Sequence, residues 1–554
     1  MRLIPTATAP TRLTDMFLQT VVLSLAESYV LVRLSYLSAV SQNTNIQFLV
    51  GAASLILLQS VAYGIYHWII YPIYFSPLLG LPEPKAPSFW NGHGKEIVIA
   101  RTGAPQKVWM REVPNDGLIL YKGIMNRERL MPTSPKVLAE VLTSKSYTFV
   151  KPRLFQFALA RLLGNGLLMA EGDEHKRQRK ILTPAFHPRH LRSLFPLFWS
   201  KSVEMVRLVS AEVEKAEVDD PVIDFNSWGS RCTLDIIGKA AAGVDFQAMT
   251  DPNGRMLQVY RKVFQPSTGQ QWLGILNMFL PPWFMRRLPL PAVMEITAAR
   301  NVIMKICEDI IRTKKVQMAE KKEMHPDILS IMMEDGGLTD EEMKNQLMTF
   351  MAAGHETTAA AVSWSCYELA RRPDIAERLR DAIREAIPDG LDDESINMDT
   401  IDNIRYLRNF CNEILRFHPP VPVTLREAGK NATLNGHFIP ENTAIMLVPA
   451  AINLSPEFWG PDADEFNPDR WDKEGGAGGA TSNYGNMTFL MGPRSCIGQK
   501  FSIEEFRALI ACIAGTFAFE EETKDMEITV RGGITQRPVH NGGLPLKTRI
   551  VPGW

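Results

Sequence analysis

The chain has 554 residues, of which 45% are hydrophobic, and its 60 Lys and Arg residues nearly balance its 61 Asp and Glu residues. The hydrophobic content predicts a globular core, and the formal net charge of −1 provides no positive field of the kind that attracts nucleic acid. The six cysteines are scattered and include no C-x-x-C pair, which argues against a disulfide framework and against a zinc site.

Residues 1–75 are expected to form a membrane anchor. The segment 48–70 contains no Asp, Glu, Lys or Arg and is long enough to cross a bilayer as a helix, with aromatic residues gathered at its far end as in an interfacial belt. The alternative for this segment is a buried core helix. The earlier apolar segment 16–40 carries Glu27 and Arg33, so it is either a second span or an interfacial helix. No small-residue cleavage site is evident, which favours a retained anchor.

Residues 76–91 are expected to be a proline-rich hinge, because four prolines fall within the first twelve of them and such segments are stiff and extended. The main domain is then 92–554. Its first part alternates short extended runs, such as 108–110 and 117–121, with turn residues, which predicts a small sheet. Long helical patterns follow, so the fold class is expected to be mainly α with a small β portion.

The longest predicted helix covers residues 339–372. Thr339 and Glu342 form a capping box at its start, and Pro373 ends it. In its middle, Glu356 and Thr357 place a carboxylate and a hydroxyl where an apolar core is expected. Buried polar groups are costly without partners, which favours a functional role. The simpler alternative is a threonine that caps a neighbouring carbonyl.

A further helix is predicted over residues 402–417, where Glu413 and Arg416 lie three residues apart and share a face. An ordinary surface ion pair at this spacing contributes only a few tenths of a kcal/mol. The pair is stronger evidence for a function than its spacing alone, because Arg470 and an unusual cysteine stretch follow it in the chain.

That stretch, 489–498, surrounds Cys496 with residues that a buried thiol does not need. Gly492 permits a turn, and Arg494 puts a cation two residues before the sulfur. A cation and the start of a helix both favour a thiolate, and a thiolate on a turn suits the axial ligand of haem iron. The simpler role of a small buried hydrophobe fits the other five cysteines better. The stretch resembles the haem-binding signature of cytochromes P450, F-x-x-G-x-R-x-C-x-G, and all its fixed positions are filled: Phe489, Gly492, Arg494, Cys496 and Gly498.

The resemblance covers about residues 90–550 and implies a cytochrome P450 fold behind the membrane anchor. It makes Cys496 the iron ligand of haem b. Residues 352–358 resemble the oxygen-activation motif of the family, in which the acid and the first threonine, here Glu356 and Thr357, relay protons. Glu413 and Arg416 match E-x-x-R, and the resemblance implies that Arg470 completes a structural triad with them.

Other roles are implied by position within the family. Arg179, and His175 in place of the usual Trp, would hold a haem propionate, as would Arg426. The apolar pocket residues would be Ala353, Val423, Leu425 and Ile534. Residues 272–284 resemble the loop that roofs the substrate cavity, although a plain core segment fits them equally well. The basic residues of the helical stretch 171–180 would help to dock an acidic reductase.

The resemblance therefore implies a haem-thiolate monooxygenase that inserts one oxygen atom from O2 into a lipophilic small molecule. No flavin or nucleotide module is left over, so electrons would come from NADPH through the flavins of a separate cytochrome P450 reductase, with cytochrome b5 as a further partner. The expected place is the endoplasmic reticulum membrane, with the haem domain in the cytosol. The sequence as a whole resembles P450s of filamentous-fungal secondary metabolism, whose substrates are terpenoids, polyketides or alkaloids. The alternatives are a haem-thiolate isomerase or dehydratase and a non-catalytic haem sensor, neither of which needs Glu356 and Thr357.

Overall fold

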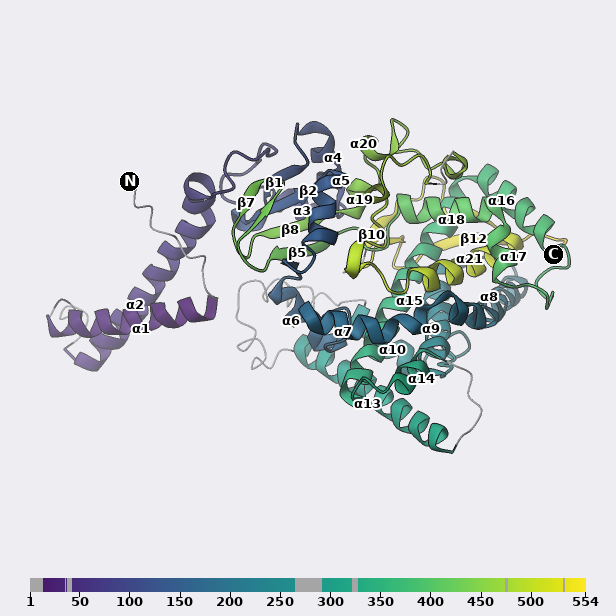
Figure 1. Ribbon diagram of the computed structural model, residues 1–554, viewed down its shortest axis with the longest axis horizontal. Helices are drawn as coiled ribbons and strands as arrows, with labels where there is room; N and C mark the ends of the chain where they lie inside the picture. The colour runs from purple at the N-terminus through teal and green to yellow at the C-terminus, as the bar shows by residue number, and fades with distance from the viewer. Residues whose placement is uncertain are drawn as a thin grey trace.

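The computed structural model describes residues 13–34, 36, 42–264, 291–320, 327–473, 477–531 and 534–554. A mainly helical domain with small sheets lies beside a pair of helices that projects away from it (Figure 1), which confirms the predicted fold class. The segment 272–284 lies outside the described residues. The helices are α1 (Leu13–Arg33), α2 (Thr44–Ile65) with its π-helical continuation Tyr66–Phe75, α3 (Gly94–Ile99), α4 (Ala104–Glu112), α5 (Pro135–Ala139), α6 (Arg153–Leu163), α7 (Gly172–Leu182), α8 (Pro188–Lys215), α9 (Phe225–Ala242), α10 (Arg255–Phe264), α13 (Pro291–Ala319), α14 (Ile328–Asp335), α15 (Asp340–Arg371), α16 (Pro373–Ala386), α17 (Met398–Asn403), α18 (Arg405–Phe417), α19 (Pro449–Ile452), α20 (Pro456–Trp459) and α21 (Gln499–Thr516).

The main sheet has five strands in the order β1-β2-β8-β5-β3, with β2 and β8 parallel and the other neighbours antiparallel. It lies on the side of the domain nearest to α1 and α2 (Figure 1). The remaining strands form one sheet in the order β4-β12-β9 and two hairpins, β6-β7 and β10-β11. The strands are β1 (Leu118–Lys122), β2 (Glu128–Pro132), β3 (Phe149–Val150), β4 (Val222–Asp224), β5 (Thr424–Ala428), β6 (Ala432–Leu434), β7 (His437–Ile439), β8 (Ala444–Leu447), β9 (Phe517–Glu521), β10 (Thr529–Arg531), β11 (Arg537–Val539) and β12 (Pro545–Ile550).

One predicted extended run is a helix. Residues 108–110 lie in α4, which begins after Gly103, a residue with φ of 90°. Trp109 is buried against the ring of Tyr121 in β1, with 4.9 Å between ring centroids. The strand prediction was wrong because a run of three residues carries no reliable period, whereas the turn at Gly103 and the burial of Trp109 select one helical face.

The predicted membrane segment lies within a long helix. Among the described residues, Thr44–Phe75 is the one helix long and apolar enough to cross a membrane, and 17% of its most apolar window is buried. Such low burial does not fit the alternative of a core helix. The hinge that follows is packed rather than free: Leu78 and Leu81 are buried with residues of β1 and β2, and the Leu120 amide donates to the carbonyl of Pro82 at 2.8 Å.

Helix α15 organises the helical part of the domain. Its 32 residues correspond to about 48 Å, and it packs against α9, α13 and α21. The predicted capping box of Thr339 and Glu342 is present. The helix predicted over 402–417 is divided at Ile404, so that α18 begins only at Arg405.

Candidate active site

Backbone geometry fixes the loop around Cys496. Gly492 has φ of +76°, and a Cβ at this position would lie 2.1 Å from the carbonyl oxygen of Leu142, so only glycine fits. The amide of Cys496 donates to the carbonyl of Phe489 at 2.9 Å. The loop therefore presents the sulfur just before the N-terminus of α21.

The environment of the sulfur differs from the one expected from the sequence. Cys496 is the cysteine with an exposed side chain, and the other five are buried. Desolvation by the surrounding protein nevertheless raises the pKa of Cys496, while the Gly498 amide, which donates to the sulfur, and the charge of Arg179 lower it. The cation that favours the thiolate is thus Arg179 and not Arg494, and the expected net lowering of the thiol pKa is wrong for the protein alone.

Aromatic contacts connect the cysteine loop to α15. A Cβ on Gly498 would lie 3.8 Å from the ring of Phe186 and 4.0 Å from the sulfur of Cys496. Phe186 in turn packs edge-on against Phe350 of α15, with 5.5 Å between centroids. A Cβ at Gly498 would thus lie at ordinary contact distance from both the sulfur and Phe186, which places Phe186 between the cysteine loop and α15.

A group of buried cations lies near the start of α7. Lys151, Arg426 and Arg494 are each less than 10% exposed. The carboxylate of Glu171 contacts both terminal guanidinium nitrogens of Arg494 and lies 3.3 Å from Lys151, and its charge also acts on Arg426. Burial lowers the pKa of Lys151 to about 8 and that of Arg426 to about 10. Within the described part of the chain the buried Nε of Arg494 has no partner. This surplus of buried positive charge and the unpaired donor fit the two propionate groups of haem.

His175 and Arg179 lie one helical turn apart on α7. The Nδ1 of His175 lies 3.1 Å from the hydroxyl of Tyr147, and burial together with neighbouring cations lowers the pKa of His175 to about 4, so the ring is neutral at neutral pH. Arg179 donates to the carbonyl of Ser495 at 2.5 Å. Sequence reasoning missed Tyr147, because nothing in its local pattern marks it.

The middle of α15 carries a polar, partly open stretch. Ala353 is exposed and Thr357 is half-buried within an otherwise buried helix, and the Thr357 hydroxyl donates to the Ala353 carbonyl at 2.8 Å. This bond is the capping alternative considered above, and it leaves the oxygen of Thr357 free to accept a hydrogen bond. The carboxylate of Glu356 is buried and lies 3.9 Å from Arg537 of β11.

A second carboxyl group next to this stretch was missed. Glu505 on α21 is fully buried and accepts a hydrogen bond from the Thr358 hydroxyl at 2.9 Å, and burial raises its pKa well above the ordinary value. A helical pattern that places Glu505 inward was the available signal. The site thus contains a buried carboxyl group, with its neutral form favoured by burial, beside the predicted relay.

Glu413, Arg416 and Arg470 meet in one fully buried cluster. Arg416 contacts both oxygens of Glu413, at 2.8 and 2.9 Å, and the Nε of Arg470 lies 3.1 Å from one of them. Arg416 also donates to three backbone carbonyls of the segment 453–465. The cluster therefore ties α18 to the chain that leads to Cys496.

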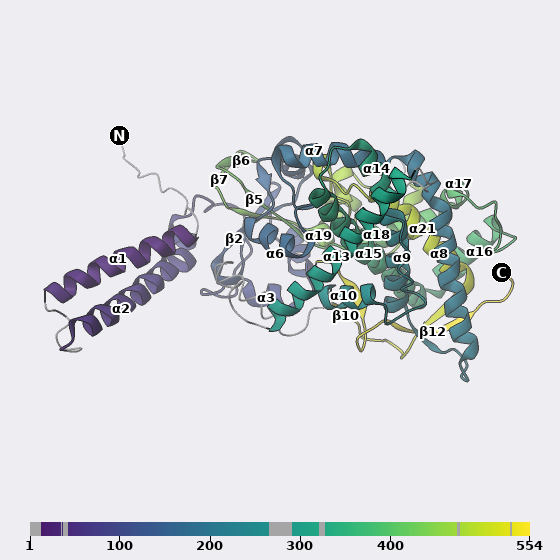
Figure 2. The ribbon, with the colours of Figure 1, turned by 90° about the horizontal axis from the view of Figure 1, so that it is seen from below.

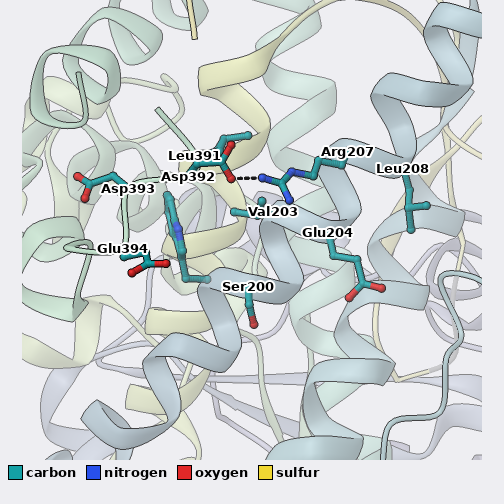
Figure 3. Close-up of a pocket in the computed structure, with 10 residues that line it drawn as sticks. Ser200, Val203, Glu204, Arg207, Leu208, Leu391, Asp392, Asp393 and Glu394 are labelled. Atoms are coloured by element: carbon teal, nitrogen blue, oxygen red, sulfur yellow. Dashed lines mark hydrogen bonds and ion pairs between the residues drawn. The ribbon is translucent and has the colours of Figure 1, made fainter. Parts of the chain in front are cut away.

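The predicted pocket residues are spread over three elements. Val423 and Leu425 flank the start of β5 and are partly buried, whereas Ile534 is exposed. A cavity of about 470 Å³ lies elsewhere, between α8 and residues 391–394 (Figure 3). It includes none of the predicted site residues, and Arg207 pairs with Asp392 at its edge. On α7, Lys176 and Arg177 are paired with Asp173 and Glu174, which weakens the predicted basic docking face.

Comparison with known proteins agrees with the motifs. A family model described as Cytochrome P450 matches residues 82–541. The chain is 41% identical to Cytochrome P450 monooxygenase sphH of Aspergillus fumigatus, over 90% of this chain and 93% of that protein. It is 36% identical to Cytochrome P450 monooxygenase FUM15 of Gibberella moniliformis, over 89% and 91%, and 34% identical to Cytochrome P450 monooxygenase ALT8 of Alternaria alternata, over 88% and 93%. The resemblance stated from the sequence is confirmed.

Proposed function

The chain belongs to the cytochrome P450 family, and from this premise we propose that it is a membrane-anchored monooxygenase that inserts one oxygen atom from O2 into a lipophilic product of fungal secondary metabolism. The observation that carries this proposal is the Cys496 loop, whose glycine turn and Gly498 amide hold a sulfur with exposed surface just before α21. Haem b, bound through this sulfur, supplies the activation of dioxygen.

The residues of the chain have separate tasks in this proposal. Arg179, Arg426 and His175 would hold the propionates, together with the Nε of Arg494, since the terminal nitrogens of Arg494 contact Glu171. Guanidinium groups are well suited to binding carboxylates. The Thr357 hydroxyl donates to the carbonyl of Ala353, so its oxygen is left to accept a hydrogen bond.

Proton delivery falls to Glu356. Its carboxylate is buried, lies 3.9 Å from Arg537 and precedes Thr357 directly in the chain. A group in this position can take up a proton from the interior and pass it on to the threonine.

Apolar side chains set the substrate class. Ala353, Val423, Leu425 and Ile534 offer no charge to a ligand, which favours a terpenoid, polyketide or alkaloid intermediate. The relatives named above come from filamentous fungi, which supports the same class. Electrons would reach the haem from NADPH through a cytochrome P450 reductase, with cytochrome b5 as a further donor, at the cytosolic face of the endoplasmic reticulum.

The test is the spectrum of the reduced, CO-bound protein in membranes. We expect the long-wavelength Soret band of thiolate-ligated haem, its loss in Cys496→Ala and its retention in Cys307→Ala, which removes a buried cysteine of α13. A band that survives in Cys496→Ala would refute the ligand assignment. Product formation that needs NADPH, reductase and O2 separates a monooxygenase from a haem-thiolate isomerase, which needs none of them, and from a sensor, which forms no product.

A further inference from the structure

Helices α1 and α2 lie side by side and run in opposite directions (Figure 2). Their contacts extend along most of both helices: the Ser24 hydroxyl donates to the side-chain oxygen of Gln59 at 3.2 Å, and the Ser28 hydroxyl donates to the carbonyl of Phe48 at 2.8 Å. The later residue of α1, Ser28, thus contacts the earlier residue of α2, Phe48, and the earlier residue Ser24 contacts the later residue Gln59. The pair is a helical hairpin.

Four polar side chains of the hairpin, those of Ser24, Glu27, Ser28 and Gln59, take part in hydrogen bonds between the two helices. The amide of Gln59 donates to the carboxylate of Glu27 at 2.5 Å, and Ser24 and Ser28 have no exposed surface. Gly51 and Ala52 are buried at the same interface, where small residues allow two helices to approach closely. Glu27, which made the earlier apolar segment doubtful as a span, therefore has a partner on α2.

The outward faces are apolar. Val22 and Val30 of α1 and Leu57 and Leu58 of α2 are each more than 50% exposed. A hairpin in water places its apolar stripe between the helices and its polar side chains outside, and this hairpin does the reverse. Lipid is the surrounding medium that suits such a surface.

Helix α1 does not meet the criteria of a span by itself, which Thr44–Phe75 alone meets among the described residues, but its length and the flanking charges agree with a second span that is paired with α2. The 21 residues of α1 extend about 31 Å, close to the thickness of a bilayer core of about 30 Å. Arg2 and Arg12 precede α1, and the segment 34–43 between the helices contains no Lys or Arg, with Arg33 just before it. Basic residues favour the cytosolic side, so this pattern places the start of α1 and the haem domain on the same side.

We propose that α1 and α2 cross the bilayer together as a hairpin, joined by Ser24, Glu27 and Gln59, with the segment 34–43 in the lumen and the start of α1 in the cytosol. The Gln59–Glu27 hydrogen bond gives the carboxyl of α1 a partner inside the membrane, where an unpaired one is costly. An interfacial α1, the alternative for this segment, would lie across the end of α2 and not along it.

Glycosylation mapping of the full chain in endoplasmic reticulum membranes tests the topology. An acceptor sequon is placed either in an extension before Met1 or in a Gly/Ser spacer between Ser38 and Ala39. We expect modification of the spacer only. Modification of the extension, or of neither site, would overturn the hairpin. The proposal rests on the proposed membrane anchoring, and alkaline carbonate extraction separates the two: release of the chain refutes the anchoring, whereas a retained chain with a modified extension refutes only the hairpin.

Disulfide trapping tests the interface. The six native cysteines all lie beyond residue 230, so cysteines introduced by Ser24→Cys and Gln59→Cys are the only ones in the hairpin. With a protease site in the spacer, oxidation should keep the two cleaved pieces together in this variant. The matched control is Val22→Cys with Gln59→Cys, because Val22 faces outward. Equal trapping in both variants would refute the interface.

Discussion

The buried carboxylate of Glu413 allows a quantitative test of what holds the haem side of the domain together. It accepts five hydrogen bonds, two from Arg416, one from Arg470, one from the Trp471 indole and one from the Asn467 amide, all between 2.8 and 3.1 Å. Glu413→Gln keeps the size of the side chain but replaces an acceptor oxygen by an N–H donor. It leaves the buried guanidinium of Arg416 without a counter-charge and that of Arg470 with Asp462 alone, at 3.3 Å. Breaking a buried ion pair in this way costs about 3–5 kcal/mol.

The matched control is an exposed pair in the same part of the chain. Arg378 donates to both oxygens of Asp469, each at 2.7 Å, and both side chains are exposed. Asp469→Asn should therefore lower the free energy of unfolding by about 1 kcal/mol or less. The assay is urea unfolding of the full chain in lipid nanodiscs, followed by far-ultraviolet circular dichroism and by the CO-bound Soret band. Equal shifts of the urea midpoint in the two variants would refute the assignment of a buried electrostatic core.

Three further outcomes are expected. Thr357→Ala keeps haem but diverts electrons from NADPH to peroxide, and unchanged coupling of NADPH oxidation to product would contradict the relay. The pKa of His175 falls from 6.5 to about 4 on folding, so between these pH values the unfolded chain binds a proton that the folded chain does not. The free energy of unfolding therefore decreases by up to about 3 kcal/mol as the pH falls through this window. His175→Gln should lose this part of the pH dependence in urea titrations, and an unchanged pH dependence of the free energy of unfolding would argue against it. Burial raises the pKa of Glu505 well above its ordinary value and so favours its neutral form. Glu505→Gln should therefore change stability by less than about 1 kcal/mol, whereas a loss of several kcal/mol in thermal or urea unfolding would mean that an ionised group was removed.

Long helices and their ends could be predicted because their signals are local. The capping box of Thr339 and Glu342 and the stop at Pro373 lie within a few residues of the boundaries that they set, and α15 has those boundaries. The strand predicted over residues 108–110 failed for the opposite reason. What makes that segment helical is the packing of Trp109 against Tyr121, which depends on a strand that follows in the chain.

The same difference between local and distant signals applies to the site. Its motif residues could be predicted from the sequence, and the contacts that set their electrostatics could not. The residues of the cysteine stretch could be named from ten consecutive positions, since the turn and the helix start are encoded there. The groups that set its electrostatics are distant in sequence: Arg179 reaches Ser495 across 316 residues, and Glu171 reaches Arg494 across 323. An arginine two residues before a sulfur was therefore a reasonable but wrong choice for the cation beside it, because the guanidinium of Arg494 is already occupied by Glu171.

The ion pair between Glu171 and Arg494 affects the charge that is available to bind haem. Glu171 neutralises one of the cations expected to meet the propionates, so the charge available to them comes chiefly from Lys151 and Arg426, which are buried and whose pKa values burial lowers. Anionic propionates would restore both pKa values towards their ordinary range, since an opposite charge favours the protonated form. Binding of haem and protonation of Lys151 are therefore linked, and affinity for haem should fall as the pH rises through about 8. Lys151→Arg, which stays charged throughout this range, should remove that decline in haem titrations, and an identical decline in the variant would show that Lys151 does not face the propionates.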